Sequence, residues 1–304
     1  MTQQTKAFNV FIAIDGSKHS LASLDLLKSL DLSGESRITL LAVVESLKSP
    51  HYYQFTRAID EAEASLSILP FKINKHILQG HPAGELVRYA DANKPDLILM
   101  GAKGLRATLG ILLGGVAQQV VEHASWPVLV TRAPYEGLNR VLLVLDGSPC
   151  SENALSYSLS FPFPPPTQII ILHVLPPLVS EQEIMSATWA TGLEAVSTRP
   201  YLQEEITKAQ QEEEIKGREL VQRAEEALGK QGFSVSSHLL RGDAATEILA
   251  YIGEHKIELI VAGSRGLSPI SSWLLGSVSR KLVHYASCSV LIVKGNYCAD
   301  KQDN

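Results

Sequence analysis

Two glycine-rich segments have the spacing of a loop that could hold a phosphate group. Residues 261–266 read Val-Ala-Gly-Ser-Arg-Gly, and Gly276 follows after nine more residues. Residues 99–104 read Leu-Met-Gly-Ala-Lys-Gly, and Gly114 follows at the same distance. Glycines after a strand let backbone N–H groups approach an anion, because no Cβ atom stands in the way. The last glycine could open a helix, whose free N–H groups and positive dipole end also favour a phosphate.

Polar side chains beside these glycines could add to such a site. Arg265 and Lys103 each precede the second glycine of their segment, and Ser277 follows Gly276 directly. Neither segment is a P-loop or the dinucleotide fingerprint, because neither contains GxxxxGK[ST] or GxGxxG. For one isolated segment, helix caps and tight turns would explain the glycines equally well. Two segments with identical glycine spacing favour a ligand site in each.

An Asp-Gly-Ser triplet, which begins at Asp15 and at Asp146, follows two other apolar runs. Ser148 precedes Pro149, which is typical of a helix start with serine as N-cap and proline at the first helical position. We therefore interpret Ser148, and Ser17 in the first triplet, as helix caps and not as nucleophiles. No Ser/His/Asp or Cys/His constellation can be assembled from the sequence, so we expect no catalytic residues.

These features recur because the sequence contains an internal repeat. Asp15 and Asp146 lie 131 positions apart, and so do Val43 and Val174, which lie in the next apolar runs. The glycines of the later segments match at an offset of 162, so the second copy carries a net insertion of 31 residues. Duplication explains several landmarks in the same order better than chance does.

The repeat predicts two domains, at residues 1–134 and 135–304, with the insertion around residues 176–206. The insertion could be a lid over the second site, an interface element or a mobile loop, and these alternatives stay open. The charged run at residues 204–226 predicts a long solvated helix with a narrow apolar stripe.

The elements that would position these residues alternate between strands and helices. Apolar runs such as residues 97–100 and 260–262 are continuous, which is typical of strands buried on both faces of a parallel sheet. We predict an α/β fold with two tandem doubly wound, Rossmann-like domains, each a five-stranded parallel sheet with helices on both faces. In such folds ligands bind beyond the carboxyl ends of the strands, where the aspartates and glycine segments fall.

On these residues the chain resembles the universal stress protein family in its tandem form. The resemblance covers nearly all of residues 5–295 and rests on Asp15, Asp146, Val43 and Val174, and on the motif G-x2-G-x9-G-[S/T]. That motif is typical of the ATP-binding branch of the family. The resemblance implies an ATP-binding regulatory or stress-response protein, in which Mg²⁺ could accompany the phosphates and ATP hydrolysis would be slow at most.

The resemblance also assigns residues to the nucleotide. In the second domain Asp146 and Gly147 would lie beside the adenosine, and the backbone of Val174 would meet the adenine edge. The ribose and phosphates would be surrounded by Gly263, Ser264, Arg265, Gly266, Gly276, Ser277, Val278 and Ser279. The corresponding residues of the first domain are Asp15, Val43, Gly101, Gly104, Gly114 and Gly115.

One position makes the two sites unequal, because Gly115 stands where the second copy has Ser277. A hydrogen bond to a charged group contributes about 1.5–3 kcal/mol. At about 1.4 kcal/mol per factor of ten, the first site would bind about 10- to 100-fold more weakly. We expect the principal nucleotide site in the second domain and a weaker or empty site in the first. The alternatives are a slow ATPase or phosphoryl-transfer enzyme on the same fold, and an interaction scaffold that binds no nucleotide.

The bulk composition fits a globular protein with an adenine nucleotide as its ligand. Of 304 residues, 45% are hydrophobic and 19% charged, and the net charge of −5 argues against a nucleic-acid partner. The sequence has no apolar leader, membrane-spanning run or metal-type cysteine pattern, so we expect a cytoplasmic protein without a membrane partner or bound structural metal. The last apolar runs, residues 128–131 and 290–293, could pair within one chain as a pseudo-dimer, and a further homodimer is open.

Overall fold

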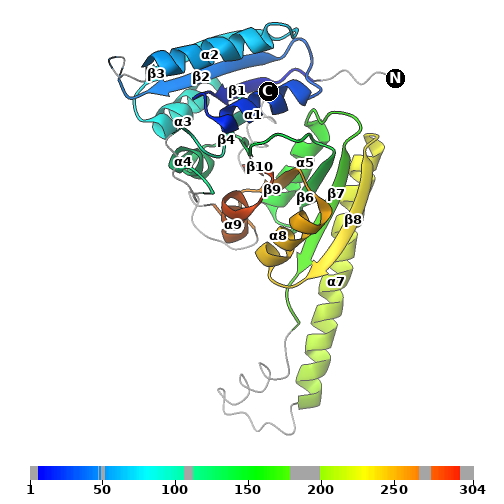
Figure 1. Cartoon of the computed structure of the whole chain (residues 1–304). Helices are drawn as coiled ribbons and strands as arrows, with labels where there is room; N and C mark the ends of the chain where they lie inside the picture. The colour runs from blue at the N-terminus through cyan, green and yellow to red at the C-terminus, as the bar shows by residue number, and fades with distance from the viewer. Residues whose placement is uncertain are drawn as a thin grey trace.

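The computed structural model describes residues 6–46, 48, 52–105, 112–178, 199–266 and 275–294, and Figure 1 shows its helices and strands. The first half of the chain contains β1 (Asn9–Ala13), α1 (Lys18–Ser29), β2 (Arg37–Val44), α2 (Tyr52–Leu66), β3 (Lys72–Gln79), α3 (Pro82–Asn93), β4 (Leu97–Gly101), α4 (Gly115–His123) and β5 (Val128–Thr131). The second half contains β6 (Arg140–Val144), α5 (Pro149–Ser160), β7 (Gln168–Leu175), α7 (Arg199–Lys230), β8 (Ser234–Arg241), α8 (Ala244–His255), β9 (Leu259–Gly263), α9 (Ser277–Tyr285) and β10 (Ser289–Val293).

The strands form one sheet in the order β3-β2-β1-β4-β5-β10-β9-β6-β7-β8. Strands within each half are parallel, and β5 pairs with β10 in the antiparallel direction. The α/β fold with parallel strands is therefore confirmed. The pairing expected between the last strands of the two copies is also present, and it joins two five-stranded sheets into one ten-stranded sheet.

Each half is doubly wound, because the chain leaves its first strand toward both edges of the sheet. In the first half β1 pairs with both β2 and β4, and in the second half β6 pairs with both β7 and β9. In the first half α1 contacts α2, and α3 contacts α4. In the second half α5 contacts α7, and α8 contacts α9. The switch points between β1 and β4 and between β6 and β9 are therefore where a ligand is expected.

The hydrophobic core runs without interruption through both halves. The rings of Phe8 and Phe161 meet edge to face at 6.4 Å between centroids, and the Tyr157 hydroxyl donates to the Asp96 carbonyl at 2.9 Å. Phe8 and Asp96 belong to the first half of the chain, and Phe161 and Tyr157 belong to the second. The two halves therefore stabilise each other through packing as well as through the β5–β10 pair.

Helix α7 confirms the long helix expected in the charged run, and it extends well past the end of the sheet (Figure 1). Its C-terminal part packs on the sheet through Leu220, Ala224 and Leu228, which are buried. Residues 179–198, which hold most of the predicted insertion, lie outside the described residues.

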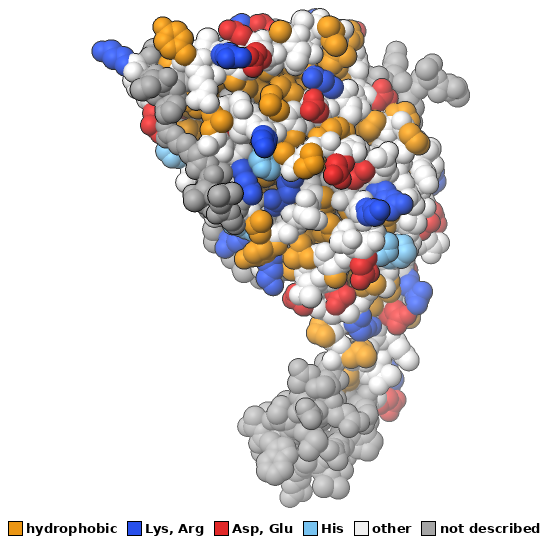
Figure 2. All heavy atoms as spheres, in the orientation of Figure 1, with side chains coloured by type: hydrophobic (Ala, Val, Ile, Leu, Met, Phe, Trp, Pro, Cys, Tyr) orange, Lys and Arg blue, Asp and Glu red, His pale blue; other side chains and the backbone are white. Residues whose placement is uncertain are grey.

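None of the described helices is both long enough and apolar enough to cross a membrane. Figure 2 shows acidic and basic side chains spread together over the face in view, with hydrophobic atoms between them. The cytoplasmic location stays a prediction.

Candidate functional site

Each half has a cavity at the carboxyl ends of its strands. The first cavity, in the first half, has a volume of about 580 Å³, and the second cavity, in the second half, about 290 Å³. Small-molecule pockets usually measure ~300–1,000 Å³, so both are of a size to receive a ligand, the second only at the lower limit.

The structure brings most of the predicted residues together around these cavities. Those that line the second cavity are Asp146, Val174, Gly263, Arg265, Gly266, Gly276, Ser277, Val278 and Ser279. Those that line the first are Asp15, Val43, Gly101, Gly104, Gly114 and Gly115. Gly147 and Ser264 do not line the second cavity, and the Ser264 side chain is buried.

The strand-end aspartates clasp the loops around them. In the first half Asp15 Oδ1 accepts the Ser17 N–H at 2.9 Å, and Oδ2 accepts the Leu105 N–H at 3.1 Å. A Cβ atom on Gly104 would lie 2.7 Å from the same Oδ2, so glycine is needed there for the carboxylate to reach the loop. Asp15 therefore links the end of β1 to the glycine segment after β4.

The second half repeats this clasp. Asp146 Oδ1 accepts the Ser148 N–H at 3.0 Å, and a Cβ atom on Gly266 would lie 2.5 Å from Asp146 Oδ2. Ser148 caps α5 by accepting the Ser151 N–H at 3.2 Å, which confirms its predicted role, and its hydroxyl donates to the Arg265 carbonyl at 3.3 Å. The aspartate and the capping serine thus both hold the glycine segment in place.

The first glycine of each segment is explained by packing alone. A Cβ atom on Gly263 would lie 2.6 Å from the Cys150 backbone, and one on Gly101 would lie 2.7 Å from the His19 backbone. These distances are far below van der Waals contact. The two glycines therefore let β9 and β4 approach the starts of α5 and α1, and they need no ligand to account for them.

The helices that follow the glycine segments begin without a side-chain cap. Gly114 and Gly276 are the N-caps of α4 and α9, and among the described residues no side chain caps either helix. By contrast, α1, α5 and α8 are capped by Ser17, Ser148 and Asp243, whereas α3 also lacks a side-chain cap at its N-cap residue His81. The open N–H groups of a first helical turn require water or a ligand as acceptor. Both open helix ends line a cavity, so both are suited to an anion.

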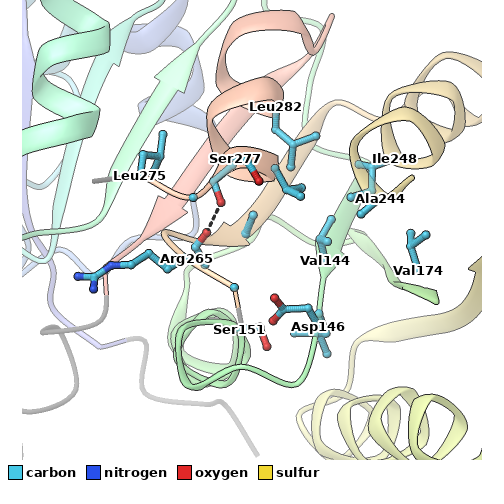
Figure 3. Close-up of a pocket in the computed structure, with 17 residues that line it drawn as sticks. Val144, Asp146, Ser151, Val174, Ala244, Ile248, Arg265, Leu275, Ser277 and Leu282 are labelled. Carbon is cyan, nitrogen blue, oxygen red and sulfur yellow. Dashed lines mark hydrogen bonds between the residues drawn. The ribbon is translucent and has the colours of Figure 1, made fainter. Parts of the chain in front are cut away.

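The hydroxyl groups at these helix starts differ between the halves. Ser279 Oγ donates to the Gly263 carbonyl at 2.7 Å, so this hydroxyl ties α9 to the end of β9 (Figure 3). Ser277 occupies the first position of α9, across the second cavity from Asp146 in Figure 3. The first half has Gly115 in that position, and a Cβ atom there would meet nothing within 4 Å. Nothing in the fold of the first half therefore requires glycine at residue 115.

The position of Arg265 differs from the expectation of a positive charge beside the phosphates. Arg265 is part of the loop that lines the second cavity, but Figure 3 shows its side chain extending away from Asp146. The guanidinium therefore lies away from the Asp146 carboxylate, on the side of the loop opposite to it in this view.

Helical residues that the sequence did not single out complete the cavity walls. The second cavity is walled by Ala244 and Ile248 of α8 and by Leu282 of α9. A sequence pattern can place such residues on an apolar helical face, but it does not show that this part of the face borders a ligand site.

The first cavity extends further, to Gln54 and Phe55 of α2 and to Glu45 and His81. In the repeat Phe55 corresponds to Gly217 of α7. A Cβ atom on Gly217 would lie 2.9 Å from the His173 ring, so α7 packs closely on β7 at this position. Residues of α2 thus border the first cavity, whereas no described residue of α7 lines the second.

Comparisons with known proteins agree with the α/β fold and with the repeat in the sequence. The model of the universal stress protein family matches the chain twice, over residues 8–132 and 137–294. Universal stress protein YxiE of Bacillus subtilis is 30% identical over 156 residues, which cover 51% of this chain and 99% of that protein. Universal stress protein MJ0531 of Methanocaldococcus jannaschii is 31% identical over 128 residues, which cover 42% and 72%.

Solved structures show the same fold over the whole chain. The crystal structure of a universal stress protein from Archaeoglobus fulgidus superimposes with a TM-score of 0.62 at 20% identity, covering 95% of this chain and 97% of that one. A functionally unknown protein from Pseudomonas aeruginosa superimposes with a TM-score of 0.63 at 14% identity, covering 98% and 97%. The arrangement of two fused halves is thus found in other proteins.

Proposed function

The chain belongs to the universal stress protein family, and from this we propose that it is an ATP-binding regulatory protein of the stress response. The proposed principal site is the second cavity, and the first cavity is a weaker site. Binding of ATP would then bias the conformation or the partners of the protein, with hydrolysis slow at most.

The observation that carries this proposal is the open N-terminus of α9 at the second cavity. Ser277 stands at its first position, no side chain of the described residues caps it, and Asp146 bounds the other side of the cavity. A helix N-terminus offers N–H groups and a positive dipole end to a phosphate. The hydroxyl of Ser277 adds one further donor, and the apolar wall from Val174 to Ile248 offers a surface for the base.

The proposed inequality of the sites rests on Ser277 and Gly115. The first cavity has the same open helix end and a larger volume, so a nucleotide fits there without the hydroxyl. The lost hydrogen bond lowers affinity, whereas the extra volume does not restore it, because contact area alone does not set affinity. We therefore propose weaker binding in the first half.

Mg²⁺ would arrive with the nucleotide. Within the described parts of the chain no three His, Cys, Asp or Glu side chains gather as a metal site. Protein-bound Mg²⁺ is usually held by substrate phosphates and waters, with only one or two carboxylates, so the residues present are compatible with it. The Asp146 carboxylate already accepts the Ser148 N–H, which favours a positioning role over that of a general base.

Calorimetric titration with MgATP tests the proposal, together with mass spectrometry of any ligand released from the purified protein. We expect one tighter and one weaker site. Ser277→Gly should weaken the tighter site about 10- to 100-fold, by loss of one hydrogen bond to a charged group. The matched control is Ser234→Gly, because Ser234 lies at the amino end of β8, whereas the cavities lie at the carboxyl ends of the strands. This variant should leave both Kd values unchanged.

Two outcomes would contradict parts of the proposal. Two equal sites would overturn the inequality between the halves. No binding heat at millimolar MgATP, with no nucleotide released, would overturn nucleotide binding and favour an interaction scaffold.

A further inference from the structure

A basic residue follows the last strand of each half, and its side chain crosses into the other half. Arg132 follows β5, and Lys294 follows β10. The two residues correspond to each other in the repeat, at the offset of 162. Because β5 and β10 pair in the antiparallel direction, each strand ends beside the opposite half.

Arg132 reaches the last turn of α9. Its Nη2 donates to the Val283 carbonyl at 2.8 Å and to the His284 carbonyl at 3.3 Å. Its Nη1 donates to the Leu112 carbonyl at 2.7 Å, within the glycine segment of its own half. One guanidinium therefore joins the loop before α4 in the first half to the C-terminus of α9 in the second half.

Lys294 makes the reciprocal contact. Its Nζ donates to the Val121 carbonyl in the last turn of α4, and its side chain is only 8% exposed. Val121 and Val283 occupy the same position in their helices, 162 residues apart. Each of these two helices is thus capped at its C-terminus by a cation from the opposite half.

Both capped helices, α4 and α9, have open N-termini that line a cavity. A cation at a helix C-terminus is favourable because it meets unpaired carbonyls and the negative dipole end. It also fixes where the helix lies along its axis, and hence where the N–H groups at the other end point. A helix of nine residues is only about 14 Å long, so a contact that fixes its C-terminus also fixes where its N-terminus lies at the cavity.

We propose that Arg132 and Lys294 are positioning residues that each half supplies to the nucleotide site of the other. Lys294 acts on the first site through α4. Arg132 acts on the second site through α9, and on the first through its bond to the loop carbonyl of Leu112. This inference rests on the proposed function, since it concerns the binding of a nucleotide at both cavities.

Capping α4 with Lys294 costs free energy, because the charged ammonium is buried. Burial first, and the charge of Arg265 second, lower the pKa of the Lys294 ammonium to about 8, while Glu122 and Cys150 oppose the shift. A carbonyl at the end of α4 could be satisfied by water at no such cost. A costly cation that contacts the helix of the opposite half is therefore better explained by positioning than by stability.

Hydrogen–deuterium exchange with mass spectrometry, during titration with MgATP, tests this for each site separately. Peptides covering residues 112–123 and 275–285 report the apparent Kd of the first and second site. Lys294→Met should raise the Kd of the first site about two- to fivefold, the range for a charge at a helix terminus, and leave the second unchanged. Arg132→Met should raise the Kd of both sites.

Two further variants separate positioning from general damage. Lys294→Arg should keep the affinity of the first site, because it keeps the charge. Lys294→Met without nucleotide should have a Tm equal to or above that of the wild type, because an apolar replacement of a buried charge is often neutral or stabilising. Arg132→Lys, which keeps one cationic donor, replaces Arg132→Met if the latter does not fold, and should give an intermediate Kd at the second site.

The outcomes that would overturn the inference differ from those that would overturn nucleotide binding. Wild-type protein without protection in either peptide at millimolar MgATP contradicts the proposed function itself. Wild-type protein that binds, with unchanged Kd values in the Lys294 and Arg132 variants, contradicts only the inference. A Lys294→Met protein with a lower Tm and equal losses at both sites also contradicts it.

Discussion

The two halves of this chain share a backbone but differ in the residues that border the cavities. Both have an aspartate clasp, a packing glycine after the fourth strand, and an open helix end at the cavity. They differ at Gly115 and Ser277, at Phe55 and Gly217, and at the cation that caps the opposite helix. Duplication has thus kept what builds the cavity, and the differences lie in hydrogen-bond donors, in volume and in charge.

These differences point in opposite directions for a ligand. Ser277 gives the second half an additional donor, whereas the cavity of this half is the smaller of the two. The first half has twice the space and one donor fewer. We expect the second site to be the tighter one, because a hydrogen bond to the phosphate contributes to affinity directly and additional volume does not.

Exchanging the two helix-start residues gives the largest expected effect on this comparison. The double variant Gly115→Ser, Ser277→Gly should strengthen the first site and weaken the second, each about 10- to 100-fold. Residue 115 has open space for a side chain, so the serine fits without strain. Site-resolved hydrogen–deuterium exchange with MgATP should then show the ranking of the sites reversed. An unchanged ranking would mean that volume, not the hydroxyl, makes the sites unequal.

The packing glycines should be equally sensitive in both halves. Gly263→Ala places a Cβ atom 2.6 Å from the Cys150 backbone, and Gly101→Ala places one 2.7 Å from the His19 backbone. Each should lower the free energy of unfolding by about 1–3 kcal/mol, as overpacking does. Gly115→Ala is the control, and it should be neutral or slightly stabilising, because its space is open. Urea denaturation measures all three, and a tolerant Gly263→Ala would show that α5 can move away.

The capping serines should matter a little less and again alike. Ser17→Ala and Ser148→Ala remove an N-cap, which costs about 1 kcal/mol. Each also removes a bond to the glycine segment, at the Lys103 or the Arg265 carbonyl, so the Kd of the site in the same half should rise as well. Asp243→Ala removes the cap of α8, and should lower stability without changing the Kd of the first site, because α8 lines only the second of the two cavities. Denaturation and calorimetry together would separate the two effects.

Much of the fold follows from the sequence because continuous apolar runs and repeated spacing are local signals. The strand runs, the Ser148 cap and the long charged helix were visible in this way. For the candidate site, the glycine spacing indicated the loops that line the cavities, but not the helices that complete their walls. What Phe55 or Gly217 does depends on how closely a helix approaches the sheet, and no local pattern shows that distance. The crossing of Arg132 and Lys294 also depends on which strands pair, and so it became visible only in the folded chain.

The smallest expected effect is a difference in pH dependence between the halves. The pKa of Lys294 is lowered to about 8, chiefly by burial, whereas arginine stays charged at all pH values of interest. Between pH 7 and 9.5 the cap on α4 therefore loses its charge and the cap on α9 does not. The Kd of the first site should rise about threefold over this range and that of the second should stay constant, as a charge at a helix terminus implies.

Stability should move the other way over the same range, which makes the two effects separable. The pKa of Lys294 in the folded state, about 8, lies below its usual value of 10.5, so between these values the unfolded chain binds more protons. The free energy of unfolding therefore rises with pH wherever this group dominates. The difference between wild type and Lys294→Met, measured by urea denaturation at several pH values, isolates that contribution from other groups. As the pH rises, the affinity of the first site should fall while the stability of the wild type relative to Lys294→Met rises. That result would show that the buried ammonium favours ligand binding and disfavours folding. If affinity and relative stability instead fall together, the first site follows the stability of the sheet.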